Sequence, residues 1–357
     1  MSLYRDRLNA KYDELTDLRI QNMPRFMRQY LNAINNKSSG TRNGYINDIE
    51  VFFTYLTEKN PLLKNQPLSA ITPEFLDQLS TMDLEEYFSD IKYIRVNGDV
   101  KQRSSASLKR NLASIRSLYK FLYSHGFIQH NPAVLVESAK LPHHDVVVLT
   151  ESEKNNMLDS IEYGTGLTDR QQSYHDNPAI GTRDIALLGL MFNTGIRVSE
   201  CVGLNLSDLN MKEHSIMVHR KNNKLQLLHF SAEVAEYLET YLESFRLRKE
   251  TLGKTEDTAL FLTMYYQRIG VRAIQRLVKK YANVAEVFQT DGHKITPHKL
   301  RSTFATEYYQ HNPNLVHLQS LMGHSDIKTT QVYVKDCDES KIDLPLRTKE
   351  KHRKNQS

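Results

Sequence analysis

Residues 296–333 read TPHKLRSTFATEYYQHNPNLVHLQSLMGHSDIKTTQVY, and this stretch decides the fold of the C-terminal half of the chain. Its opening Thr-Pro is typical of a helix start, with threonine as the N-cap and proline at the first helical position. Leucines at helical spacing mark a second helix, which Gly323 is placed to end. His324 follows on the turn, and a short third helix is predicted to carry Tyr333.

Four side chains in this stretch can act on a phosphodiester, namely His298, Arg301, His324 and Tyr333, and Arg197 stands far upstream. If a helix starts at the proline, His298 and Arg301 share one face near its positive end, where a phosphate is favoured. Arginines can hold a phosphate, imidazoles can move protons and a phenol can attack. This set of groups needs no metal and no other cofactor, so we expect none. Each residue alone would usually be surface or core, and only their joint occurrence is informative.

Composition sets the broad class of the protein. The length of 357 residues favours two domains. A net charge of +5 and a pI near 8.9 fit a polyanionic partner without proving one. The mean hydropathy of -0.54 argues against a membrane protein, and the first residues lack the apolar core of a signal peptide. Cys201 and Cys337 are too few for a disulfide framework and too far apart for a metal knuckle, so we expect a reducing, cytoplasmic setting.

The first half has helical periodicity. One amphipathic helix, closed by Gly126, is predicted to carry basic residues on its polar side: Lys109, Arg110, Arg116 and Lys120. Such a helix can bury its apolar face and lay the basic one on DNA phosphates. A solvated helix face is an equally good interpretation. The basic C-terminal tail carries the same two interpretations.

The second half mixes helices with a little strand. Residues 215–230 alternate apolar and polar side chains around Lys221-Asn222-Asn223-Lys224, which predicts a β-hairpin with its turn at these residues. Helices are predicted over 232–249 and 269–281. Residues 164–181 are polar and loosely patterned, and we interpret them as a loop insertion of unknown purpose.

Taken in order, these motifs resemble those of the tyrosine recombinases, the phage-integrase and Xer superfamily. The matching segments are the arginine motif at 194–200, the His-x-x-Arg box at 298–301, Leu-Met-Gly-His at 321–324, and Tyr333. The helical N-terminal half is similar to the family's core-binding domain, especially from 116 to 133. The resemblance covers nearly the whole chain after about residue 23.

The resemblance implies a mainly α fold with a small β-hairpin or sheet in the catalytic domain, and two domains that form a C-shaped clamp on DNA. The expected parts are a helical leader at 1–22, a SAM-like core-binding domain at 23–140, a linker at 141–147, a catalytic domain at 148–335, and a protomer-exchange segment with a basic tail at 336–357.

The same resemblance implies a role for each site residue. Tyr333 is the nucleophile that forms a 3′-phosphotyrosyl bond, and Arg197 and Arg301 clamp the phosphate. His298 is the general base, and His324 donates a hydrogen bond to the phosphate. Glu200 supports Arg197.

The general acid is expected on the hairpin. Lys221 fits best and Lys224 is the alternative. The family often has glycines beside this lysine, whereas Arg220 and Asn222 stand here.

The implied partner is double-stranded DNA with inverted-repeat half-sites, bound by a homotetramer that assembles on DNA, with an unidentified regulatory protein as a further possibility. The chain is most similar to the XerS type of chromosome recombinase, which implies chromosome dimer resolution at cell division by a cytoplasmic, nucleoid-associated enzyme. An integrase of a phage, plasmid or conjugative element is the alternative, although residues 1–22 are short for an arm-binding domain. A DNA-binding protein that has lost its chemistry is a more remote alternative.

Overall fold

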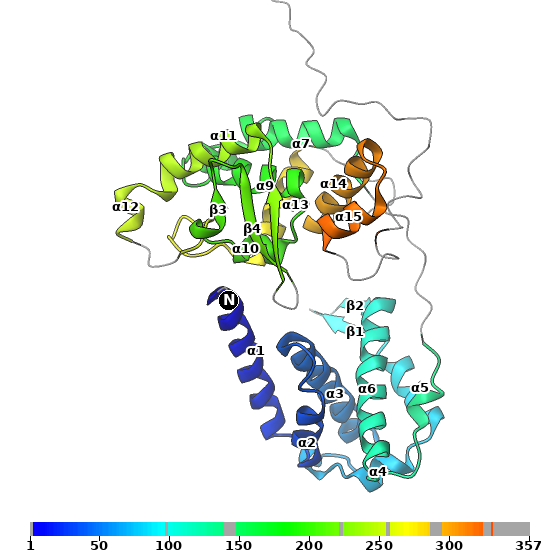
Figure 1. The fold of residues 1–357 in the computed structure, drawn as a ribbon. Helices are drawn as coiled ribbons and strands as arrows, with labels where there is room; N and C mark the ends of the chain where they lie inside the picture. The colour runs from blue at the N-terminus through cyan, green and yellow to red at the C-terminus, as the bar shows by residue number, and fades with distance from the viewer. Residues whose placement is uncertain are drawn as a thin grey trace, which may run out of the picture. The chain divides into compact units, whose positions relative to one another are not determined.

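The computed structural model describes residues 3–96, 99–138, 148–220, 224–254, 258–285, 295–323 and 330. The chain divides into two compact units, Met1–His143 and His144–Ser357, which we call unit 1 and unit 2 (Figure 1). The expected linker, 141–147, lies outside the described residues. In the ranges given above, none of the helices has the length and apolar character that crossing a membrane requires.

Unit 1 is a helical domain with one small hairpin. Its elements are α1 (Leu3–Gln21), α2 (Phe26–Ala33), α3 (Ser39–Lys59), η1 (Leu68–Ala70), α4 (Pro73–Gln78), α5 (Thr81–Asp90), β1 (Tyr93–Val96), β2 (Asp99–Gln102), α6 (Ser105–Ser124) and η2 (Pro132–Val134). Hydroxyl side chains start four of these helices, because Ser38, Thr72, Ser80 and Ser104 each accept a hydrogen bond from the backbone N–H three residues on. As predicted, α6 ends just before Gly126, whose φ is 72°.

An aromatic core holds unit 1 together. Phe52 and Tyr87 pack edge to face with their ring centroids 4.9 Å apart, and both are fully buried. The buried hydroxyl groups have partners: Tyr87 Oη donates to Asn111 Oδ1 at 3.1 Å and Tyr119 Oη donates to the Leu76 carbonyl at 3.2 Å. The long helices α3 and α6 are therefore fixed to each other and to α4 and α5 by packing and by directed bonds.

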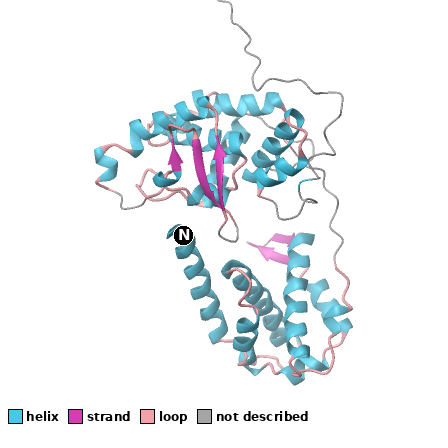
Figure 2. Cartoon of the chain, viewed as in Figure 1, coloured by secondary structure: helices cyan, strands magenta, loops and turns pink. Residues whose placement is uncertain are grey.

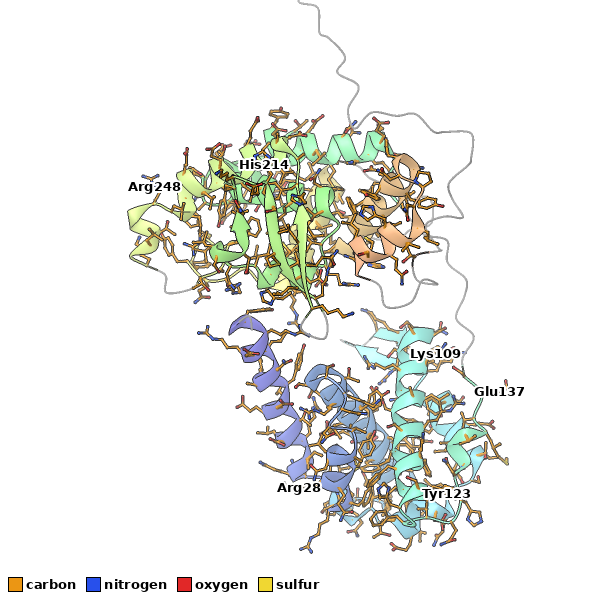
Figure 3. All side chains as sticks on the ribbon, in the orientation of Figure 1. Arg28, Lys109, Tyr123, Glu137, His214 and Arg248 are labelled. Atoms are coloured by element: carbon orange, nitrogen blue, oxygen red, sulfur yellow. The ribbon has the colours of Figure 1, made fainter. Side chains whose placement is uncertain are left out.

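Two of the four basic residues on α6 are engaged inside unit 1. Arg110 donates from Nε and Nη2 to the carboxylate of Asp48, at 3.0 and 2.9 Å, and Asp48 is only 2% exposed. Arg116 donates to the backbone carbonyls of Ala133 and Val136, which fixes the segment after α6. Lys109, near the N-terminal end of α6 in Figure 3, is exposed.

Unit 2 is built around a buried helix. Its elements are α7 (Glu151–Tyr163), α8 (Asp169–His175), α9 (Gly181–Thr194), α10 (Val198–Gly203), η3 (Leu206–Asp208), β3 (Leu209–Asn210), β4 (Ser215–His219), β5 (Leu225–His229), α11 (Ala232–Tyr241), the π-turn η5 (Leu242–Arg246), α12 (Lys249–Leu252), α13 (Val271–Val284), α14 (Pro297–His311) and α15 (Leu315–Met322). Nearly every residue of α9 is buried, and α7, α11 and α14 pack against it. Figure 1 shows α14 and α15 together, in orange, at one end of this unit.

The predicted hairpin is present as part of a three-stranded antiparallel sheet, ordered β3-β4-β5 (Figure 2). The β4–β5 register pairs Ser215 with His229 and His219 with Leu225. The turn that joins these strands includes 221–223, which lie outside the described residues. The predicted mainly helical class with a small sheet is therefore confirmed.

Two local expectations were wrong, and one element was not anticipated. The stretch 164–181 is not only loop, because Thr168 starts α8 with a capping box to Gln171. The helix expected over 232–249 changes to a π-turn after Tyr241, and α12 follows separately. The β1–β2 hairpin of unit 1 was not anticipated; β2 is exposed along its whole length, so it shows no alternation of buried and exposed residues to detect.

The Arg110–Asp48 pair leads to a stability prediction. Arg110→Ala leaves a buried carboxylate without its two charged hydrogen bonds, so we expect the free energy of unfolding to fall by about 2 kcal/mol. Lys109→Ala, which removes the neighbouring exposed cation, should change it by less than about 0.5 kcal/mol. Urea denaturation followed by circular dichroism measures both, and equal midpoints for the two variants would contradict the assignment.

Candidate active site

Gly195 brings α9 and α14 together. It ends α9 in the left-handed conformation, with φ 59°. A Cβ at this position would lie 2.3 Å from Cδ1 of Phe304 on α14, so only glycine allows the approach. The Gly195 carbonyl accepts a hydrogen bond from Arg301 Nη1. The end of the buried helix is thereby joined to the helix that carries the His-x-x-Arg box.

Arg197 stands at the N-cap of α10 and is oriented by Glu200, as expected from the sequence. Its Nη1 donates to Glu200 Oε1 at 2.8 Å, and its backbone N–H donates to Oε2 at 3.0 Å. Its Nη2 donates to the Gly323 carbonyl at 3.1 Å. The side chain of Arg197 remains 34% exposed while Glu200 is 7% exposed. A guanidinium held in this way can bind a ligand on its solvent-exposed side while it keeps its hydrogen bond to the Glu200 carboxylate.

Arg301 is buried and also reaches the C-terminal end of α15. It is 2% exposed and donates from Nη1 to the Gly195 carbonyl and from Nη2 to the Met322 carbonyl. Met322 is the last residue of α15 and Gly323 is its C-cap. The two arginines therefore converge on consecutive carbonyls at the negative end of one helix, where positive charge is stabilised.

His298 lies in the first turn of α14, next to these arginines. The residue is exposed, but partial desolvation by the surrounding protein lowers the pKa of its imidazole, and the positive charges of Arg301 and Arg197 lower it further. A lowered pKa keeps the ring neutral at pH 7. A neutral imidazole can accept a proton, which is what a general base must do.

The structure describes only some of the predicted site. Arg197, His298, Arg301 and Lys224 lie in the described residues, whereas Lys221, His324 and Tyr333 lie outside them. Lys224 is exposed, and its carbonyl accepts a hydrogen bond from the Arg220 N–H at 2.7 Å, which closes the hairpin turn. Gly323, with φ 59°, ends α15 as predicted and directly precedes His324.

The sequence did not predict one residue of the hydrogen-bond network around Glu200, namely Arg220. Arg220 is 4% exposed and donates to Glu200 Oε2 at 2.6 Å, so one carboxylate supports two arginines. The one sequence feature that could have indicated it is that an arginine directly precedes Lys221, at a position where the family often has glycine. Its partner Glu200 is far away in sequence, and no spacing rule connects the two residues.

Comparisons with known proteins show the family of this chain. The model of the phage integrase family matches residues 148–340, which is more than half of the chain. The chain is 30% identical over 340 residues to a tyrosine recombinase XerC of Caldanaerobacter subterraneus subsp. tengcongensis, covering 93% of this chain and 88% of the relative. It is 31% identical to a tyrosine recombinase XerD of Staphylococcus saprophyticus subsp. saprophyticus, covering 83% and 88% respectively.

Solved structures share the fold. A XerH site-specific recombinase bound to its palindromic difH substrate superposes with a TM-score of 0.61 at 17% identity, covering 87% of this chain and 80% of that one. A lambda integrase dimer bound to a core site has a TM-score of 0.61 at 14% identity, covering 90% and 98%. The chain belongs to the phage integrase family, and within that family it is a tyrosine recombinase.

The electrostatic setting of His298 can be tested by titration. In the protein without DNA, the imidazole should titrate below 6.5, the pKa of an unperturbed histidine, because desolvation and two nearby cations oppose its protonation. NMR measures the midpoint, and loss of the signal in His298→Gln assigns it among the 14 histidines. Arg197→Gln, which removes one of the cations, should raise the midpoint. A midpoint above 6.5 in the unaltered protein would contradict the description of the site.

Proposed function

We propose that this protein cuts and rejoins double-stranded DNA at specific sites through a 3′-phosphotyrosyl intermediate. The observation that carries the proposal is the convergence of Arg197 and Arg301 on the last carbonyls of α15, beside the neutral imidazole of His298. Two guanidiniums at one point can bind both non-bridging oxygens of a phosphate. Charge that builds on those oxygens during the reaction is then stabilised by groups that are already in place.

Each group has one task in the proposed reaction. The phenolic oxygen of Tyr333 attacks the phosphorus and passes its proton to His298, while the bond from phosphorus to the 5′-oxygen breaks. The departing 5′-oxygen takes a proton from the hairpin lysine, and His324 donates a hydrogen bond to the phosphate. Rejoining is the reverse reaction with a 5′-hydroxyl of another strand. The phosphotyrosyl ester retains the bond energy, so no ATP is required.

Unit 1 would supply many of the contacts with the DNA backbone. Lys109 and Lys120 are exposed on α6 and suit phosphate contacts. Arg116 already holds backbone carbonyls and Arg110 holds Asp48, so any contact they make with DNA would be shared with these structural roles. The two units together would form a clamp around the duplex.

The biological role we favour is resolution of chromosome dimers by a XerS-type enzyme in the cytoplasm, acting on the nucleoid. Two relatives, 30% and 31% identical in sequence to this chain, are named XerC and XerD, which supports a Xer-type role. Inverted half-sites would each bind one protomer, and exchange of residues 336–346 between neighbours would close a tetramer. Footprinting on genomic DNA would distinguish a chromosomal site from an attachment site beside the gene, which an integrase would occupy.

Covalent trapping tests the reaction itself. A DNA substrate with a nick beside the scissile phosphate loses the 5′-hydroxyl needed for rejoining, so a protein–DNA adduct should accumulate on a denaturing gel. Tyr333→Phe should bind the same DNA with unchanged affinity and form no adduct, because it lacks the attacking oxygen. An adduct in that variant would refute the nucleophile. Binding without an adduct in the unaltered protein would instead indicate a DNA-binding protein without chemistry.

The general acid can be assigned by changing the leaving group. Lys221→Ala should slow cleavage of normal DNA by about 100-fold or more, since general acid catalysis contributes that much. A 5′-bridging sulfur leaves without a proton, so this substrate should restore the rate. Lys224→Ala is the matched control on the same turn. Rescue seen only in Lys224→Ala would transfer the role to Lys224.

A further inference from the structure

Arg220 uses all three nitrogens of its guanidinium group to join separate parts of unit 2. Nη1 donates to Glu200 Oε2 at 2.6 Å, Nη2 to the Leu321 carbonyl at 2.8 Å, and Nε to Gln226 Oε1 at 2.9 Å. These partners belong to α10, to the last turn of α15 and to strand β5. A planar guanidinium can serve three such acceptors at once, whereas the ammonium of lysine is a single point of charge.

The surroundings of Arg220 favour one fixed conformation. Its side chain is 5% exposed and that of Glu200 is 7% exposed, so the two charges neutralise each other away from bulk water. A Cβ on Gly323 would lie 3.1 Å from Arg220 Nε, which means that the backbone turn before His324 packs directly on this side chain. Gln226 extends the same contact, because its Nε2 donates to the Ser320 carbonyl at 2.9 Å.

Arg220 also begins the turn that holds the candidate general acids. It directly precedes Lys221, and its N–H donates to the Lys224 carbonyl at 2.7 Å. The hairpin is thus attached at its base to Glu200, which orients Arg197, and to the end of α15, which leads into His324. Arg220, which precedes Lys221, thus links Arg197 to the last turn of α15, just before Gly323 and His324 in the sequence.

We propose that Arg220 is a positioning residue that sets the hairpin lysine and Arg197 at the correct places relative to the end of α15. This inference rests on the proposed function of the site. Arg220 itself need not touch DNA. It would act by fixing the base of the turn for the proton donor and by sharing the carboxylate of Glu200 with Arg197. A misplacement of the donor by about 1 Å is enough to slow a reaction strongly.

The inference predicts a selective loss of acid catalysis. Arg220→Gln should cleave normal DNA about 100-fold more slowly, but the 5′-sulfur substrate only about 10-fold more slowly, because sulfur needs no proton from the lysine while the phosphate still needs Arg197. The quantity to measure is the ratio of single-turnover rates on the two substrates. Inactive or unfolded molecules lower both rates equally, so the ratio reports positioning and not folding.

Two further variants complete the experiment. Arg268→Gln is the matched control, since Arg268 also donates to backbone carbonyls in unit 2, at Val202 and Leu204, and to Asn205 Oδ1, and these three acceptors belong neither to Glu200 nor to the hairpin. Its rate ratio should equal that of the unaltered protein. Arg220→Lys keeps a positive charge near Glu200 but cannot make all three contacts, so its ratio should lie between those of the unaltered protein and Arg220→Gln.

The outcomes distinguish the positioning role of Arg220 from the proposed function of the site. A ratio for Arg220→Gln within about twofold of the control means that no interaction specific to the acid step was lost, and the positioning role is overturned. Absence of any covalent adduct in the unaltered protein, on either substrate, would refute the proposed function itself.

Discussion

The end of helix α15 is the constraint on which the rest of the site depends. Three consecutive carbonyls, those of Leu321, Met322 and Gly323, accept hydrogen bonds from Arg220, Arg301 and Arg197 respectively. A helix terminus leaves such carbonyls without internal partners and carries partial negative charge. Side chains from three distant segments satisfy them here, so the helix end gathers the positive charge that a phosphate would meet.

Placing three guanidinium groups at one helix end is unfavourable unless the repulsion between their positive charges is offset. Glu200 offsets part of this repulsion, since its Oε1 accepts from the Arg197 guanidinium and its Oε2 from the Arg220 guanidinium. The backbone has to approach closely for this to work, and glycine makes that possible twice. Gly195 lies against Phe304, and Gly323 lies against Arg220, both with φ 59°. A side chain at either position would be strained and would push apart the segments that carry the arginines.

In unit 1 the basic side of α6 is divided between residues with partners inside the unit and residues exposed to solvent. All four cations of α6 lie on its polar side, yet Arg110 binds the buried Asp48 and Arg116 holds the chain after the helix. Lys109 and Lys120 remain exposed. The sequence alone could not separate the two groups, because a partner such as Asp48 comes from another helix. The choice between a DNA-binding face and a solvated face thus applies to the exposed lysines, whereas the two arginines have partners inside unit 1.

Local signals in the sequence determined where many elements begin and end. The proline after Thr296 and the glycines at 126 and 323 act through bonds and dihedral angles within a few residues, so they could be read directly. Family motifs likewise pointed to Arg197, His298 and Arg301, which the structure brings close together. Where local signals were weak or absent, as in the exposed strand β2, the prediction failed.

Only the tertiary structure decided how the site is supported. The sharing of Glu200 by Arg197 and Arg220, and the meeting of three arginines at one helix end, join segments up to 126 residues apart. Such contacts follow from the packing of α9, α10, α14 and α15 together, and packing depends on the shapes of many side chains at once. A sequence pattern states which groups are available, whereas their distances and burial arise when the chain closes around them.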